Sequence, residues 1–130
     1  MDKWFGVVVD PNIQRVTRID LRNNGLNGSI PPEIGGLTKL SQLDLSENYL
    51  PERLPIEISN LDSLTVLELR GTSLVSVEGI QNLAELTELY IGANQLTEIP
   101  DLTSLEKLKE VYFSGNRFLL QFPSLPNSER

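Results

Sequence analysis

Apolar residues recur along the chain in one eleven-residue pattern, L-x-x-L-x-L-x-x-N-x-L, in which most x positions are polar. The pattern occurs five times, 24, 24, 22 and 22 residues apart, and its copies begin at Val16, Leu40, Leu64, Leu86 and Leu108. The middle of each copy alternates between apolar and polar residues, as a β-strand with one buried face does. Intervals of this length are typical of solenoids in which each copy forms one coil. The pattern therefore predicts five short parallel strands, stacked side by side.

The strand alternation divides the residues of each copy between two faces. The apolar residues are predicted to point inward: Ile19, Leu21, Leu43, Leu45, Leu67, Leu69, Leu89, Ile91, Val111 and Phe113. The residues between them point outward in columns, because equivalent residues of stacked coils lie next to each other. The central column is predicted to be Asp20, Asp44, Glu68, Tyr90 and Tyr112.

The ninth position of the pattern is Asn in four copies and Thr in one. An Asn amide both donates and accepts hydrogen bonds, so it can satisfy backbone groups of its own turn and of the adjacent coil. We expect a structural ladder formed by Asn24, Asn48, Thr72, Asn94 and Asn116. Thr72 offers only a hydroxyl, so its rung is expected to be weaker.

The repeated pattern resembles that of leucine-rich repeat proteins, and two segments refine the resemblance. LNGSIPPEIGGL at 26–37 is similar to the L-x-G-x-I-P-x-x-I-G-x-L return of plant-type repeats, and WFGV at 4–7 resembles the W-x-G-V segment of the plant-type N-terminal cap. That cap folds a short strand back before the first repeat and normally carries cysteines, which this chain lacks. The third and fourth returns, 77–83 and 99–105, look like the 22-residue class of intracellular phosphatase regulators. The resemblance thus implies a hybrid of two repeat classes.

The predicted fold is an α/β-type repeat solenoid, a right-handed leucine-rich repeat coil. It has five parallel concave strands and mostly extended or 3₁₀ convex segments. We expect residues 1–15 to form the N-terminal cap and residues 16–130 to form the five repeats, the last being incomplete or serving as the C-terminal cap. The apolar residues expected to cover the first coil are Trp4, Phe5, Val7 and Val9.

Composition narrows the classes of function. The chain has 11 Lys plus Arg and 18 Asp plus Glu, a formal net charge of -7, which disfavours nucleic acid and anionic membranes as partners. It has no Cys and no His, so disulfides, thiolate metal sites and a Ser-His-Asp triad are excluded. We expect no cofactor, no metal and no enzymatic activity. Asp44 and Glu68 could pair as acid and base, but they are predicted to lie on an open surface without the desolvation that such pairs need.

The candidate binding site is the concave face, where solenoids present a rigid surface to a partner. We expect non-catalytic recognition of a protein or peptide, as in an adaptor or receptor-like module. The residues predicted to take part are Arg18, Asp20, Arg22, Asp44, Glu68, Arg70, Glu88, Tyr90, Glu110 and Tyr112. In the alternative reading, the three arginines only neutralise the acids in a solvated network.

The sequence is also compatible with other roles and locations. The C-terminal apolar residues Phe118, Leu119, Leu120 and Phe122 form a cap, an interrupted core or a surface for self-association into a homo-oligomer. Resemblance of the shorter repeats implies a regulatory subunit of a phosphatase or kinase. The N-terminal sequence shows no hydrophobic leader, so a cytoplasmic location is expected, or an extracellular one if a leader has been removed. Asn27-Gly28-Ser29 matches a glycosylation acceptor but is expected to be a turn.

Overall fold

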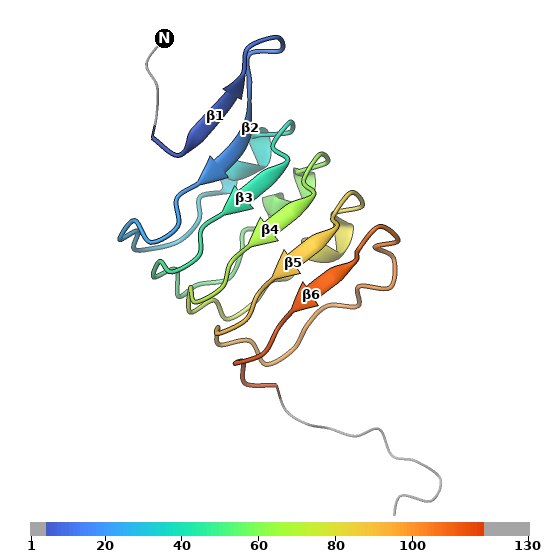
Figure 1. The fold of residues 1–130 in the computed structure, drawn as a ribbon. Coiled ribbons are helices and arrows are strands. Elements are labelled where there is room, and N and C mark those ends of the chain that lie inside the picture. The colour runs from blue at the N-terminus through green and yellow to red at the C-terminus, as the bar shows by residue number, and fades with distance from the viewer. Residues whose placement is uncertain (1–4, 119–130) are drawn as a thin grey trace, which may run out of the picture.

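One six-stranded sheet runs along one side of the solenoid (Figure 1). The computed structural model describes residues 5–118. The strands are β1 (Val7–Asp10), β2 (Arg15–Asp20), β3 (Gln42–Asp44), β4 (Val66–Glu68), β5 (Glu88–Tyr90) and β6 (Glu110–Tyr112), paired in chain order. Strands β2 to β6 are parallel, whereas β1 folds back antiparallel on β2. The five predicted parallel strands are confirmed.

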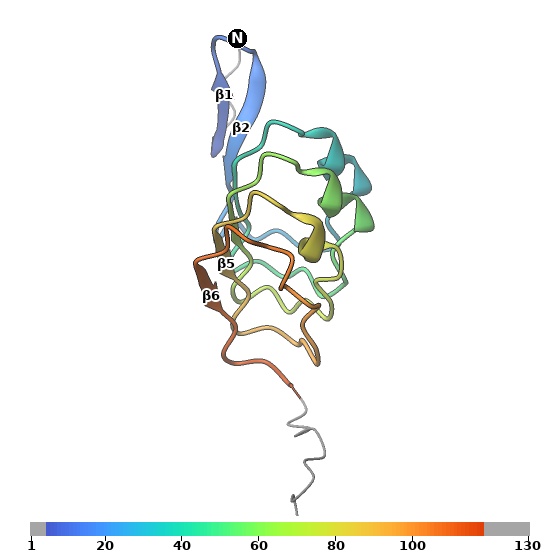
Figure 2. The ribbon, with the colours of Figure 1, turned by 90° about the vertical axis from the view of Figure 1, so that its right-hand side faces the viewer.

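Short 3₁₀ helices lie opposite the sheet (Figure 2). They are η1 (Pro32–Gly36), η2 (Ile56–Asn60) and η3 (Ile80–Asn82), one in each of the first three returns. Proline precedes the first two helices at Pro31 and Pro55 and holds the entering chain extended, with φ of -71° and -65°. The prediction of extended and 3₁₀ returns is confirmed.

The core lies between the sheet and these returns. The leucines that open the second, third and fourth copies are completely buried, as are Leu67, Leu69, Leu89 and Ile91. Each buried leucine stabilises the fold by about 2 kcal/mol relative to an exposed one. Because coils share this core only with their neighbours, the stack is cooperative.

Two residues at the ends of the solenoid depart from the predicted burial. Phe5 is 90% exposed, although it was expected to cover the first coil; Gly6, with φ +81°, interrupts the extended chain between Phe5 and β1. Phe113 is 47% exposed because it belongs to the last coil that the structure describes, at the end of the stack. Val7 and Val9 are half-buried, and Trp4 lies outside the described residues.

Asparagine side chains join successive coils just after the strands. Asn94 is 2% exposed, and its Oδ1 accepts hydrogen bonds from the backbone N–H groups of Thr72 and Leu74, both at 3.0 Å. Its Nδ2 donates to the carbonyls of three residues, Leu69, Ile91 and Gly92. Asn48 makes the equivalent contacts one coil earlier, and Asn116 makes part of them one coil later.

The first and third rungs differ from this arrangement. Asn24 is exposed and donates to the carbonyl of Arg22 in its own turn. Thr72 turns its hydroxyl toward the carbonyl of Leu69 and toward Asn94 Oδ1, both at 2.8 Å. On its other side, the Thr72 backbone carbonyl accepts the N–H of Leu50. The rung thus uses main-chain atoms where Asn48 and Asn94 use a side-chain amide.

Candidate functional site

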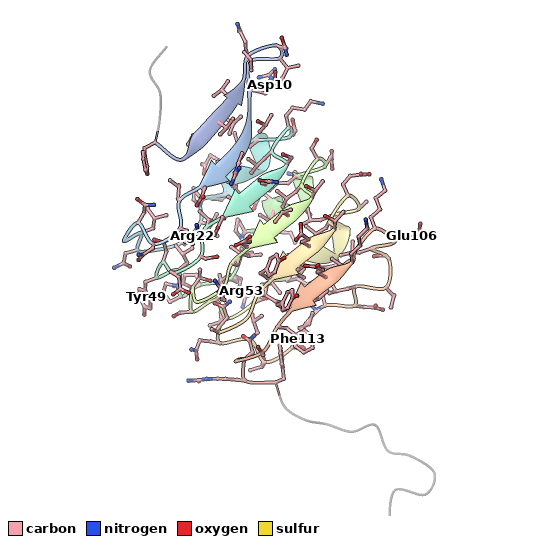
Figure 3. All side chains as sticks on the ribbon, viewed as in Figure 1. Asp10, Arg22, Tyr49, Arg53, Glu106 and Phe113 are labelled. Carbon is pink, nitrogen blue, oxygen red and sulfur yellow. The ribbon has the colours of Figure 1, made fainter. Side chains whose placement is uncertain are left out.

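The outer face of the sheet presents three aligned columns of side chains. The strand register aligns the central column, Asp20, Asp44, Glu68, Tyr90 and Tyr112, and a second column, Arg18, Gln42, Val66, Glu88 and Glu110. Parallel backbone hydrogen bonds continue beyond the strands and align a third column, Arg22, Ser46, Arg70, Gly92 and Ser114. We call these three columns the sheet face (Figure 3). The ten residues predicted for the concave surface all belong to it.

Carboxylates crowd the middle of the sheet face. Asp44 and Glu68 are register partners on adjacent strands, and the Asp44 side chain is only 16% exposed. Burial of Glu68 raises the pKa of its carboxyl, and the neighbouring Asp44 carboxylate raises it further, whereas Arg22 and Arg70 lower it. The expectation that these carboxylates lie in the open without desolvation is therefore wrong.

The arginines neutralise this acidic column only in part. Arg22 Nη1 lies 3.9 Å from Asp44 Oδ2, a weak contact at an exposed guanidinium. Arg70 instead pairs at 3.9 Å with Glu47, in the turn after β3. Among the residues that the structure describes, no Lys or Arg nitrogen lies within 4 Å of the Glu68, Glu88 or Glu110 carboxylates. The three glutamates of the C-terminal half of the sheet face thus form no ion pair with a described basic side chain.

Two tyrosines stack beside these carboxylates. The Tyr90 and Tyr112 rings are nearly parallel, with an interplanar angle of 6° and centroids 5.0 Å apart. The Tyr90 hydroxyl lies 2.7 Å from Glu88 Oε1 and 3.0 Å from Glu110 Oε2. Its hydrogen bond to Glu88 raises the pKa of the Tyr90 phenol, and partial desolvation and Glu110 add to the increase. Tyr112 is 56% exposed. Together these four residues form an aromatic surface bordered by acceptors, which we call the tyrosine patch.

A recess of about 270 Å³ lies away from the tyrosine patch, at the N-terminal end of the solenoid. Its lining is mostly apolar and comes from the first two coils; it includes Ile19, Leu21, Leu26, Ile30, Ile34, Leu43, Leu45 and Leu50. The small residues next to the tyrosines, Gly92, Ala93, Ser114 and Gly115, do not line this recess.

The structure reveals two polar features that sequence analysis missed. A hydroxyl ladder joins the starts of the strands, in which the side chains of Ser41, Thr65 and Thr87 each donate to the carbonyl of the equivalent residue in the preceding coil. Recurrence of Ser or Thr at the second position of the pattern was the available signal. The second feature is Ser46, which is fully buried and whose Oγ has no hydrogen-bond partner among the described residues.

The predicted self-association segment is described only at its start. Phe118 is half-buried, packs against the core and meets the Phe113 ring at 5.9 Å in an edge-to-face contact. Leu119, Leu120 and Phe122 lie outside the described residues.

Within residues 5–118, the structure shows no group of three or more acidic side chains placed to hold a metal ion. Over the same residues, no helix is long and apolar enough to span a membrane.

Comparisons with known proteins match the chain over nearly all of its length. The family model for paired leucine-rich repeats matches residues 62–104 and 85–127, and the model for the single repeat matches residues 15–37 and 39–61. A search of curated proteins finds no match.

Several solved structures have the same fold. The BIR2 ectodomain from Arabidopsis thaliana is 26% identical with a TM-score of 0.78, and the match covers 92% of this chain and 77% of that one. The BIR3–SERK2 complex from the same plant gives 31% identity and a TM-score of 0.80, covering 88% of this chain and 64% of that one. The plant peptide hormone receptor RGFR1, solved with RGF2, is 31% identical with a TM-score of 0.74, covering 91% of this chain but 22% of the receptor chain.

The family models together span residues 15–127, and they agree with the parallel strands, the buried leucines and the asparagine positions described above. The chain therefore belongs to the leucine-rich repeat family.

Proposed function

We propose that this protein binds a protein or peptide partner, without catalysis, through the sheet face. The observation that carries the proposal is the tyrosine patch, where two stacked rings lie among carboxylates that form no ion pair with a described basic side chain. Tyrosines supply large amphipathic contact area and are enriched where binding energy concentrates. Because the surrounding backbone is tied coil to coil, little conformational entropy is lost when a partner docks.

The proposed footprint is the set of ten residues predicted from the sequence: Arg18, Asp20, Arg22, Asp44, Glu68, Arg70, Glu88, Tyr90, Glu110 and Tyr112. In this arrangement, residues 1–15 serve as a cap and residues 16–130 provide the repeats that carry the footprint. Asp44, Glu68, Tyr90 and Tyr112 lie in one column and form its centre.

Structural relatives support this role. The BIR3–SERK2 structure is a complex of two proteins, and RGFR1 is a peptide hormone receptor solved with RGF2. This chain spans only 22% of the RGFR1 chain. We therefore propose for this chain the same kind of recognition, binding of a peptide or protein, and not the same ligand. BIR2 is described as an ectodomain, which favours the extracellular alternative for this chain over the cytoplasmic one.

A selection experiment tests the proposal. Random peptides displayed on phage are selected against the protein and then measured for binding to a variant carrying Asp44→Lys, Glu68→Lys, Tyr90→Ala and Tyr112→Ala. We expect that the selected peptides do not bind this variant, and that its circular dichroism spectrum shows it to be folded. A matched control carries Glu98→Lys, Glu106→Lys and Tyr49→Ala, which are exposed and lie off the sheet face. Equal binding to both variants would contradict the proposal.

Self-association through the C-terminal end is the second candidate. The observation in its favour is Phe113, which is 47% exposed beside Phe118 at the end of the described stack. Light scattering over a range of concentrations should then show a defined oligomer, and Phe113→Ser together with Phe118→Ser should dissolve it. A monomer at every concentration would exclude this candidate.

A further inference from the structure

We infer that the sheet face recognises a partner segment that presents an arginine side chain to the tyrosine patch. This inference rests on the proposed function and specifies the chemistry of its ligand. It concerns Glu88, Tyr90, Glu110 and Tyr112, with Glu68 as the neighbouring acid on β4.

The first argument is that the Glu88 and Glu110 carboxylates share one hydroxyl proton and have no ion-pair partner among the described residues. Glu88 and Glu110 are register partners on adjacent strands, and one oxygen of each lies within 3.0 Å of the Tyr90 hydroxyl. That hydroxyl has one proton, so it donates fully to only one of the two carboxylates, and the other receives no proton from Tyr90. Like charges directly opposite on neighbouring strands repel. A bound cation with several N–H donors removes both penalties.

The second argument is the shape of the aromatic surface. One face of the Tyr112 ring is covered by Tyr90, and Tyr112 still exposes 56% of its surface. A planar guanidinium can extend such a stack and at the same time direct the N–H groups of its edge to a neighbouring carboxylate. A lysine ammonium is a compact, strongly hydrated charge and provides no flat surface for stacking. The combination of a parallel ring pair and bordering carboxylates therefore favours arginine over lysine.

The third argument concerns the reach of the acidic surface. Asp44 and Glu68 form a second carboxylate pair, and Glu68 lies two strands away from Tyr112 in the same column. Two strand spacings are about 10 Å. Three residues of a segment in the polyproline II conformation rise about 9 Å and complete one turn, so side chains three residues apart point to the same side. A segment with two arginines three residues apart, running across the strands, would place one at each acidic site. The net charge of -7 attracts such a segment from a distance.

The experiment uses a synthetic glycine–serine octapeptide with arginine at its third and sixth positions. A second peptide carries citrulline at both positions, which keeps the shape and removes the charge, and a third carries lysine. Binding to the ¹⁵N-labelled protein is followed by NMR titration at low salt. We expect the arginine peptide to shift the amide signals of β5 and β6. The lysine peptide should bind about two- to fivefold more weakly, the range expected for loss of stacking on an exposed ring, and the citrulline peptide should not bind.

Matched variants assign the site. Tyr112→Ala and Glu110→Gln should each weaken binding of the arginine peptide, whereas Tyr49→Ala and Glu106→Gln, which remove the same groups from exposed positions off the sheet face, should not. The inference is overturned if citrulline binds as well as arginine, if Glu106→Gln weakens binding as much as Glu110→Gln, or if the arginine peptide does not bind.

The selected phage peptides separate failure of this inference from failure of the proposed function. Peptides that need the sheet face but tolerate citrulline in place of arginine would refute the arginine site and leave the proposed function standing. If no peptide depends on the sheet face, both fall.

Discussion

The hydroxyl of Tyr90 on β5 lies 3.0 Å from Oε2 of Glu110 on β6, while it also contacts Glu88 at 2.7 Å on its own strand. The contact joins the central column to the second column and crosses from one repeat to the next. It depends on a neutral phenol, because a phenolate would face two carboxylates. The ionisation of Tyr90 therefore reports directly on the integrity of the tyrosine patch.

Alkaline titration should reveal this phenol. The two glutamates raise the pKa of Tyr90 above its ordinary value of 10.0. The stability contributed by its hydrogen bonds is thus fully present below pH 10 and is lost as pH rises through the raised pKa. In a spectrophotometric titration of tyrosinate absorbance, Tyr90→Phe should remove the tyrosine that ionises last, and Glu88→Gln should move that ionisation to lower pH. If Tyr90→Phe removes a tyrosine that ionises first, the contacts described here do not form in solution.

Glu68→Gln should stabilise the protein at neutral pH. Burial and the Asp44 carboxylate raise the pKa of Glu68, so its ionisation opposes folding. A carboxyl whose pKa is raised by folding contributes its full stability below the pKa of the unfolded state, 4.5. This contribution declines as pH rises through the pKa of the folded state. Glutamine does not titrate, so the variant should be more stable at pH 7 by up to about 1 kcal/mol, the size of a cross-strand charge repulsion.

Thermal unfolding at several pH values measures this difference. The gain of Glu68→Gln over the natural protein should shrink as pH falls and vanish below pH 4.5, where Glu68 is protonated in both states. Glu106→Gln serves as the control, since Glu106 is exposed in the return before β6. A gain that is the same at pH 4 and pH 7 would point to packing of the amide and not to relief of charge repulsion.

The asparagine ladder should contribute unequally along the solenoid. Asn94→Ala removes a buried amide and leaves the N–H groups of Thr72 and Leu74 without their acceptor, while the carbonyl of Leu69 keeps the Thr72 hydroxyl as a donor. Each unsatisfied buried group costs about 1 to 3 kcal/mol, so we expect a loss of about 3 kcal/mol or more. Asn24→Ala breaks one exposed hydrogen bond and should cost less than about 1 kcal/mol. Urea unfolding of both variants measures the two losses of stability. Equal losses would contradict the expectation that the buried Asn94 contributes more than the exposed Asn24.

The column of Asp20, Asp44, Glu68, Tyr90 and Tyr112 could be predicted from the sequence because two constraints act together. Side chains of a strand alternate with a period of two, and coils of nearly equal length place equivalent positions side by side. The register of all five parallel strands follows this prediction. Hydrogen bonding of the ninth position could be anticipated in the same way, because an amide suits a turn whose backbone groups face the next coil.

The repeat pattern could not predict which side chains pair between columns. It also could not predict how deeply residues at the two ends of the solenoid are buried. Arg70 has a long side chain that could reach several acids, and it pairs with Glu47 in a turn. The alternative reading of the sequence, in which the arginines only neutralise the acids, did not specify this partner. Tyr90 selects Glu88 and Glu110 through its side-chain conformation, which the repeat does not fix. Phe5 and Phe113 lie at the two ends of the described stack, where a neighbouring coil is present on one side only, so the repeat pattern does not determine their burial.

Backbone geometry at the eighth position of the pattern gives a last prediction. All five residues there have φ between +51° and +77°: Asn23, Glu47, Gly71, Ala93 and Gly115. An L-residue pays about 1 to 2 kcal/mol for this left-handed conformation, which turns the chain out of the sheet. At Gly115 an added Cβ would also lie 3.1 Å from the backbone nitrogen of Ala93. Gly115→Ala should therefore destabilise the protein by about 2 kcal/mol in urea unfolding.

The reciprocal substitution, Ala93→Gly, provides the control for this geometry. Glycine relieves the cost of the left-handed backbone at φ +52° but adds about 0.5 to 1 kcal/mol of conformational entropy to the unfolded chain. The two effects nearly offset each other, so the variant should be as stable as the natural protein or more stable by less than about 1 kcal/mol. In an extended or helical backbone, the same substitution would destabilise. A clear loss of stability in Ala93→Gly would therefore mean that the fourth coil does not turn through the left-handed region, and the rung made by Asn94 directly after it would need to be reassigned.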